Sequence, residues 1–98
     1  MVEIKKGEQL IVHLSDRLDA TNAEATRKII VDSINKIETD VLIDVDDLKY
    51  ISSAGLQVIL YLAKETKAVG KQTLLRGAKG EVWEIFKLSG FLTFLKEI

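Results

Sequence analysis

The chain has 98 residues, of which 47% are hydrophobic and 30% are charged, and its formal net charge is −1. A chain of this length forms one small domain with a single core, so we expect one domain over residues 1–98. The near-zero charge argues against nucleic acid and anionic membranes as partners, and the absence of cysteine excludes disulfides and thiol chemistry.

The N-terminal residues predict a pair of strands. Residues 2–4 and 9–14 are rich in β-forming residues, and Gly7 and Glu8 lie between them as a turn. This N-terminus has no apolar segment of the kind found in a signal peptide. We therefore expect a cytoplasmic protein.

A helix is expected after this strand pair. Residues 15–20 predict a polar loop, and Thr21 and Glu24 then have the spacing of a capping box, which marks a helix start. The helix is expected to end at residues 39–40. Its buried face, at helical spacing, consists of Ala23, Ile30, Ile34 and Ile37.

Strands and helices then alternate to the C-terminus. The expected elements are a strand over residues 41–45, a helix over 53–69, a strand over 72–76, a helix over 80–88, and a short helical turn or strand over 91–95. Gly70 and Gly90 mark the ends of the two helices.

This order of elements predicts an α/β fold. Strands connected through helices are parallel, and such crossovers are nearly always right-handed. Residues 10–14 and 41–45 alternate between apolar positions and more mixed ones, so one face of the sheet is better covered than the other. We expect a mixed, mostly parallel sheet with an N-terminal strand pair and helices mainly on one face.

Residues 47–60 are the most informative part of the chain, because Ser52 and Ser53 fall where a strand is followed by a helix. A helix N-terminus favours negative charge, so a serine there can cap the helix or carry a phosphate. Both readings remain open. Gly55 in the first turn weakens a helix by about 1 kcal/mol, which indicates that close packing or the approach of another molecule requires it.

Candidate catalytic groups are few. His13 is the only histidine, and its mid-strand position indicates a half-exposed residue with no special role. Carboxylates at Asp16, Asp19, Asp44, Asp46 and Asp47 could hold Mg²⁺, although solvated turn residues are the simpler interpretation. We predict no catalytic residue, no metal and no cofactor.

The second helix has apolar side chains on two sides. Leu56, Ile59, Leu60 and Ala63 form its core stripe, while Val58, Tyr61 and Leu62 lie opposite. Either a neighbouring helix wraps around this side, or the three residues form an exposed patch that binds a partner.

These features together resemble the STAS domain of bacterial anti-sigma factor antagonists. The resemblance covers nearly the whole chain. The residues that carry it are the Leu18-Asp19 loop, Asp44, the run Asp47-Leu48-Lys49-Tyr50-Ile51-Ser52-Ser53-Ala54-Gly55-Leu56, Gly70-Lys71, and Leu88-Ser89-Gly90-Phe91.

The resemblance implies a binding protein and not an enzyme. Such an antagonist binds an anti-sigma factor that is also a serine kinase, and so releases a sigma factor. The kinase phosphorylates the antagonist and breaks the complex, and a metal-dependent phosphatase resets it. The motif places the phosphorylated residue at Ser53, with Ser52 as second choice, because Ser52 stands where the family often has Asp.

The expected partner-binding residues are Asp19, Thr21, Tyr50, Ser52, Ala54, Gly55, Val58, Tyr61 and Leu62, and a monomer or weak dimer is expected. Two alternatives remain open. The chain could be a STAS subunit or scaffold of a transporter or signalling complex that is not phosphorylated. It could also be a nucleotide-binding domain that uses the acidic loops.

Overall fold

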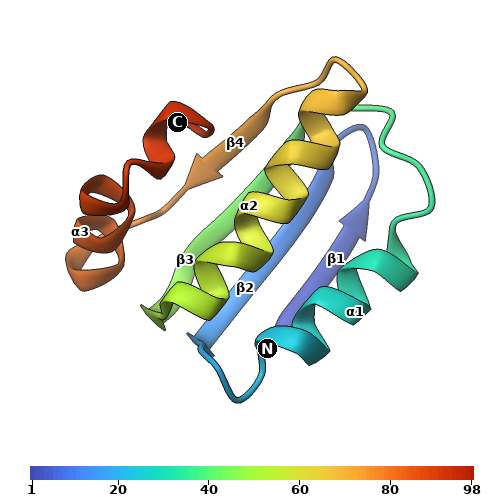
Figure 1. The fold of residues 1–98 in the computed structure, drawn as a ribbon. Coiled ribbons are helices and arrows are strands. Elements are labelled where there is room, and N and C mark those ends of the chain that lie inside the picture. Colours follow the sequence, from blue (N-terminus) through green and yellow to red (C-terminus); the bar gives the residue numbers. More distant parts are fainter.

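The computed structural model describes residues 1–98, and its strands and helices alternate along most of the chain (Figure 1). Its elements are, in order, β1 (Val2–Lys6), β2 (Leu10–Leu18), α1 (Ala23–Ser33), β3 (Val41–Ile51), α2 (Ser53–Ala68), β4 (Thr73–Arg76), α3 (Gly80–Ser89), the short 3₁₀ helix η1 (Phe91–Thr93) and β5 (Lys96–Glu97). The predicted order of strands and helices is confirmed.

The sheet is mixed and mostly parallel, as predicted. Its strands follow the order β1-β2-β3-β4-β5, with β1 antiparallel to β2 and the other neighbours parallel. A tight turn can join only antiparallel strands, whereas each parallel pair here is connected through a helix. The order of the strands in the sheet is the same as their order in the chain.

The helices cover one face of the sheet. Figure 1 shows α1 and α2 lying over the sheet on the same side, roughly along the strands. Buried side chains of α1, α2 and α3 form one cluster with alternate residues of the strands, such as Val12, Ile43 and Leu75. On the opposite face the alternate positions His13 and Asp44 are only partly buried.

Three strands, β1, β2 and β3, are longer than predicted, and part of the expected polar loop is strand. The register between β2 and β3 shifts at two places, between His13 and Ser15 and between Asp16 and Arg17. Asp16 adopts a left-handed conformation with φ of 65°. Such irregularities break the two-residue alternation that identifies a strand in sequence, so the predicted loop over residues 15–20 was wrong for its first four residues.

Helix α1 is shorter than predicted and starts differently. It ends at Ser33, and Ile34 has an extended backbone with φ of −110° and ψ of 95°. Ile34 and Ile37 still pack on the core, but from the segment after the helix. The predicted capping box was wrong, because Asn22 is the N-cap residue and no side chain caps the helix.

The later elements agree closely with the predictions. Helix α2 starts at Ser53 and is followed by Val69 and Gly70, and Gly90 ends α3 with a left-handed φ of 78°. The predicted C-terminal segment, residues 91–95, contains the helical turn η1, and the strand β5 follows after it. None of the helices has the length and hydropathy needed to cross a membrane.

Candidate functional site

The start of α2 is fixed by the end of β2. Leu18 and Ile51 are the last paired residues of β2 and β3. Beyond them, the backbone N–H of Ser52 donates a hydrogen bond to the carbonyl oxygen of Leu18, with an N–O distance of 2.9 Å. The chain turns from strand to helix at this point, so the first turn of α2 lies at the carboxyl edge of the sheet.

The two serines have different environments. The Ser52 side chain is the N-cap of α2: it is half-buried, and its hydroxyl oxygen accepts a hydrogen bond from the backbone N–H of Gly55 (3.3 Å). Ser53 is the first helical residue, and its side chain is exposed. Ser52 therefore caps α2, and the Ser53 hydroxyl is not used as a cap.

Gly55 is required for packing inside the domain. A Cβ atom at this position would lie 2.7 Å from the Leu18 carbonyl oxygen and 2.9 Å from a side-chain carbon of Ile51. Such distances are too short for any other residue. Gly55 is buried, so it gives no open approach to a partner, and only Ala54 remains as a small, partly exposed residue beside the serines.

The turn between β2 and α1 is held by its own polar side chains. Asp19 accepts hydrogen bonds from the hydroxyl and the backbone N–H of Thr21, and Asn22 accepts one from the backbone N–H of Asp19 (2.9 Å). The bonds from Thr21, together with one from Arg17, hold the pKa of Asp19 below its ordinary value of 3.8. Asp19 and Thr21, both predicted site residues, are thus rigid neighbours at this edge of the sheet.

Tyr50 connects this turn to β3. Arg17 pairs with Tyr50 across the two strands, and its guanidinium carbon lies 4.7 Å from the centre of the tyrosine ring. The Nε atom of the same arginine is 3.2 Å from Oδ2 of Asp19. Arg17 therefore contacts two predicted site residues, Asp19 and Tyr50. It belongs to no recognisable sequence motif, so no pattern indicated it.

The predicted exposed patch on α2 is wrong. Val58 and Leu62 are 4% and 2% exposed and belong to the core, because α1 packs against this side of α2. Tyr61 is partly buried and lies beneath Arg27 of α1, with 4.6 Å between the guanidinium carbon and the ring centre. The alternative that a neighbouring helix wraps α2 is the correct one.

A groove between the N-terminal halves of α1 and α2 remains open beside the serines. Its volume is about 530 Å³. Three predicted site residues, Ala54, Val58 and Tyr61, line it from α2 together with the exposed Gln57. The opposite wall consists of Ala20, Ala23, Glu24 and Arg27.

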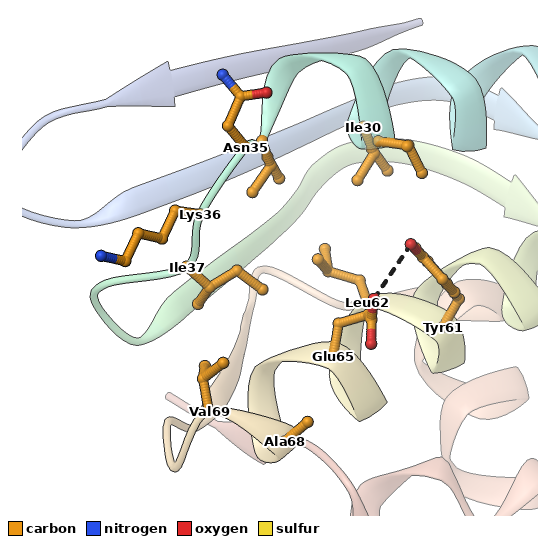
Figure 2. Close-up of a pocket in the computed structure, with 11 residues that line it drawn as sticks. Ile30, Asn35, Lys36, Ile37, Tyr61, Leu62, Glu65, Ala68 and Val69 are labelled. Carbon is orange, nitrogen blue, oxygen red and sulfur yellow. Dashed lines mark hydrogen bonds between the residues drawn. The ribbon is translucent and has the colours of Figure 1, made fainter.

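A second pocket, of about 270 Å³, lies between the C-terminal half of α2 and the segment that follows α1 (Figure 2). Ile30, Ile37 and Leu62 form apolar walls, and the hydroxyl of Tyr61 donates to a carboxylate oxygen of Glu65 (3.4 Å). The pocket contains neither serine. It arises because the chain leaves its helix after Ser33 and places Ile37 opposite α2.

His13 has partners that the sequence analysis missed. Its Nδ1 atom lies 3.3 Å from Oδ2 of Asp44, and its Nε2 atom lies 3.2 Å from Oδ2 of Asp47. Parallel pairing of His13 with Asp44 creates this contact across β2 and β3. His13 is thus half-exposed within a strand, as predicted, and it also links two carboxylates on the open face of the sheet, a contact that the sequence did not indicate.

The acidic residues in the middle of β3 are also paired with basic ones. Arg76 lies 2.9 Å from Asp44, and Lys79 lies 3.2 Å from Asp46. Burial of Asp44 raises its pKa, but hydrogen bonds from Arg76, the Asp46 backbone N–H and His13 outweigh burial and hold the pKa below its ordinary value. These carboxylates are therefore neutralised largely by side chains of the domain itself.

Comparisons with known proteins agree with this architecture. The STAS domain family matches residues 1–98. BtrV of Bordetella bronchiseptica, provisionally named an anti-sigma factor antagonist, is 38% identical over 84 residues, which is 86% of this chain and 72% of that protein.

Two solved structures have the same fold. A Thermotoga maritima protein with the same provisional name gives a TM-score of 0.88 at 21% identity, over 98% of this chain and 84% of that chain. The phosphorylated form of the Bacillus cell fate determinant SpoIIAA gives a TM-score of 0.75 at 20% identity, over 100% of this chain and 91% of that chain. The family match extends over all residues, so the chain belongs to the STAS domain family.

Proposed function

We propose that this STAS domain is an anti-sigma factor antagonist. It binds an anti-sigma factor that is also a serine kinase, so that a sigma factor is released, and phosphorylation of Ser53 ends this binding. A metal-dependent phosphatase then restores the active form. The name of the BtrV relative supports the antagonist function, and the phosphorylated structure of SpoIIAA supports the switch.

The observation that carries the proposal is the difference in environment between the two serines. The Ser52 hydroxyl caps α2 and is half-buried, whereas the Ser53 side chain is exposed at the first helical position. A kinase can reach Ser53 without removing the cap. Phosphorylating Ser52 would instead require loss of the hydrogen bond from Gly55, so Ser53 is the favoured acceptor.

A phosphate on Ser53 is compatible with the fold of the domain. It adds a charge of about −1.5 to −2 at neutral pH, and the N-terminal end of a helix carries roughly half a positive charge. The domain therefore tolerates the modified residue. A partner seated over Ser53 would have to remove water from that charge, which is costly without a cationic counterpart.

The groove beside Ser53 is the proposed docking surface. Ala54, Gln57 and Tyr61 lie along α2 next to the serine, and the hydrogen-bonded Asp19–Thr21 turn adjoins the start of the same helix through Leu18. Val58 contributes only the floor of the groove, and Gly55 and Leu62 contribute by holding the helices in place.

The test is to incubate the chain with its cognate anti-sigma factor kinase and ATP, and to locate the phosphate by mass spectrometry. We expect modification of Ser53 and loss of the complex, while Ser53→Ala remains a permanent binder. A phosphate on Ser52 alone would contradict the choice of residue. Stable binding with no phosphate on either serine would favour the alternative of a STAS subunit or scaffold.

A further inference from the structure

A polar pocket of about 320 Å³ lies at the opposite end of α2 from Ser53. The last turn of α2, the turn into β4, and the segment between η1 and β5 form its walls. Its polar lining residues are Lys67, Lys71, Gln72, Thr73, Thr93 and Lys96. Ala63 and Lys67, the pocket residues of α2, lie ten and fourteen residues after Ser53, which corresponds to about 15 and 21 Å along the helix at 1.5 Å per residue.

The three lysines of this pocket have no acidic partner. None of Lys67, Lys71 and Lys96 lies within 4.0 Å of a carboxylate oxygen, whereas Lys79 and Lys87 each do. No acidic residue lines the pocket. Its walls therefore carry three lysine charges that form no ion pair within the domain, and the nearest recorded carboxylate contact is that of Asp40 with the backbone N–H of Gln72 (2.9 Å).

The lysines are not needed to cap α2. The backbone N–H of Gly70 donates to the carbonyl oxygen of Lys67 (2.9 Å), and the backbone N–H of Lys71 donates to that of Thr66 (3.0 Å). These bonds satisfy carbonyl groups of the last turn, with Gly70 in the left-handed conformation that such a helix end requires. The ammonium groups remain available for another molecule.

Thr73 adds an unpaired polar group to the residues that line this pocket. It is 4% exposed, and its hydroxyl is the one buried side-chain polar group of the chain without a hydrogen-bond partner. As the first residue of β4 it shares a face with the buried Leu75, so its side chain is directed to the helix side of the sheet, where the pocket lies. Buried hydroxyls are normally paired, as that of Thr66 is with the Leu62 carbonyl oxygen (2.7 Å).

We propose that this pocket binds a small polyanion of the phosphate class. Three ammonium groups exceed the partial negative charge of about one half at the C-terminus of α2, and lysine binds phosphate as a point charge. The Thr73 hydroxyl is closed to solvent in the free protein, and rotation of its side chain about χ1 would let it donate to a phosphate oxygen. The volume lies at the small end of ligand pockets, which run from about 300 to 1,000 Å³, so the ligand is compact. This site is independent of the proposed antagonist function.

The first experiment is an NMR titration of the isotope-labelled full chain with pyrophosphate at constant ionic strength. We expect saturable shifts for residues 67–73 and 93–96, and none for Ser52 and Ser53. The double variant Lys67→Gln/Lys71→Gln should weaken binding by about tenfold or more, equivalent to roughly 1.4 kcal/mol. Lys28→Gln/Lys64→Gln removes two exposed charges outside the pocket and should leave the affinity unchanged.

Titrations with inorganic phosphate and adenosine monophosphate under the same conditions show which kind of phosphate compound the pocket prefers. Tighter binding of pyrophosphate indicates a diphosphate, and tighter binding of the nucleotide indicates a phosphorylated metabolite. Failure of all three to saturate would overturn the proposal. Equal losses of affinity in the Lys28/Lys64 and the Lys67/Lys71 variants would also overturn it, because they would show attraction by overall charge only.

Thr73→Val tests the unpaired hydroxyl separately. Valine has nearly the same shape and does not leave a buried polar group without a partner. We expect the melting temperature of the free protein to stay the same or rise, while the affinity for pyrophosphate falls severalfold. Unchanged affinity in a folded Thr73→Val variant would show that the hydroxyl does not face the ligand and would overturn the site as described.

Discussion

The carbonyl oxygen of Leu18 occupies the space that a side chain at Gly55 would need, since a Cβ atom there would lie only 2.7 Å away. The same oxygen accepts the hydrogen bond from the backbone N–H of Ser52. One carbonyl group of β2 therefore determines where α2 starts and which residue can stand at its third position. Through these two contacts, it also holds Ser53 at the edge of the sheet.

Gly55→Ala should destabilise the domain, although alanine is the better helix former by about 1 kcal/mol. The new methyl group would push against a backbone carbonyl that cannot move freely, and overpacking of this kind costs about 1 to 3 kcal/mol. Urea denaturation measures the effect. Gly7→Ala is the control, because no atom lies within 4 Å of a Cβ there, and it should change stability little. Equal stability of wild type and Gly55→Ala would contradict the packing argument.

Ser52→Ala and Ser53→Ala should differ in their effect on stability, because only Ser52 caps α2. Loss of the Ser52 cap should lower the free energy of unfolding by about 1 kcal/mol, whereas the exposed Ser53 should change it by less than about 0.5 kcal/mol. Chemical denaturation of the two variants side by side makes the comparison. A larger loss at Ser53 would mean that the assignment of the cap is wrong.

Val58→Asp should unfold the domain. The residue is 4% exposed between α1 and α2, and an unpaired charge buried there costs about 3 to 5 kcal/mol. Circular dichroism should show loss of cooperative melting. Gln57→Asp places the same charge on the neighbouring exposed position, so it should leave the melting temperature within a few degrees while weakening binding of the anti-sigma factor. Normal binding by Gln57→Asp would place the docking surface elsewhere.

The stability of the domain should fall at acidic pH in part through Asp44. Its folded pKa lies below the ordinary value of 3.8, so the unfolded chain takes up the proton first. The contribution is complete above that value and is lost as pH falls through the folded pKa. Asp44→Asn should therefore be less stable than wild type at pH 7, and the difference should shrink below pH 3.8. A constant difference across this range would show that ionisation of Asp44 is not involved.

Phosphorylation of Ser53 should act locally, without refolding the domain. Amide NMR shifts on phosphorylation should be confined to the end of β3, the first turns of α2 and the adjacent turn after β2. Ser53→Asp should reproduce the loss of binding only in part, because a carboxylate has less charge than a phosphate. Shifts that extend through α1 and the sheet would instead indicate a conformational switch.

Local sequence patterns were sufficient for much of the fold. The spacing of apolar residues predicted α2 and its neighbouring strands, and Gly90 predicted the end of α3. These features depend on residues close in sequence, where periodicity and backbone preferences are decisive. The predicted position of Ser53, at the start of a helix, needed no knowledge of the rest of the chain.

The tertiary structure alone decided the features that depend on distant contacts. Whether Val58 faces solvent depends on where α1 lies, and the role of Gly55 depends on a carbonyl group 37 positions earlier, at Leu18. The link between His13 and Asp44 depends on the register of two parallel strands. A sequence lists which side chains are present, but packing and strand register decide which atoms meet, and these emerge only when the whole chain folds.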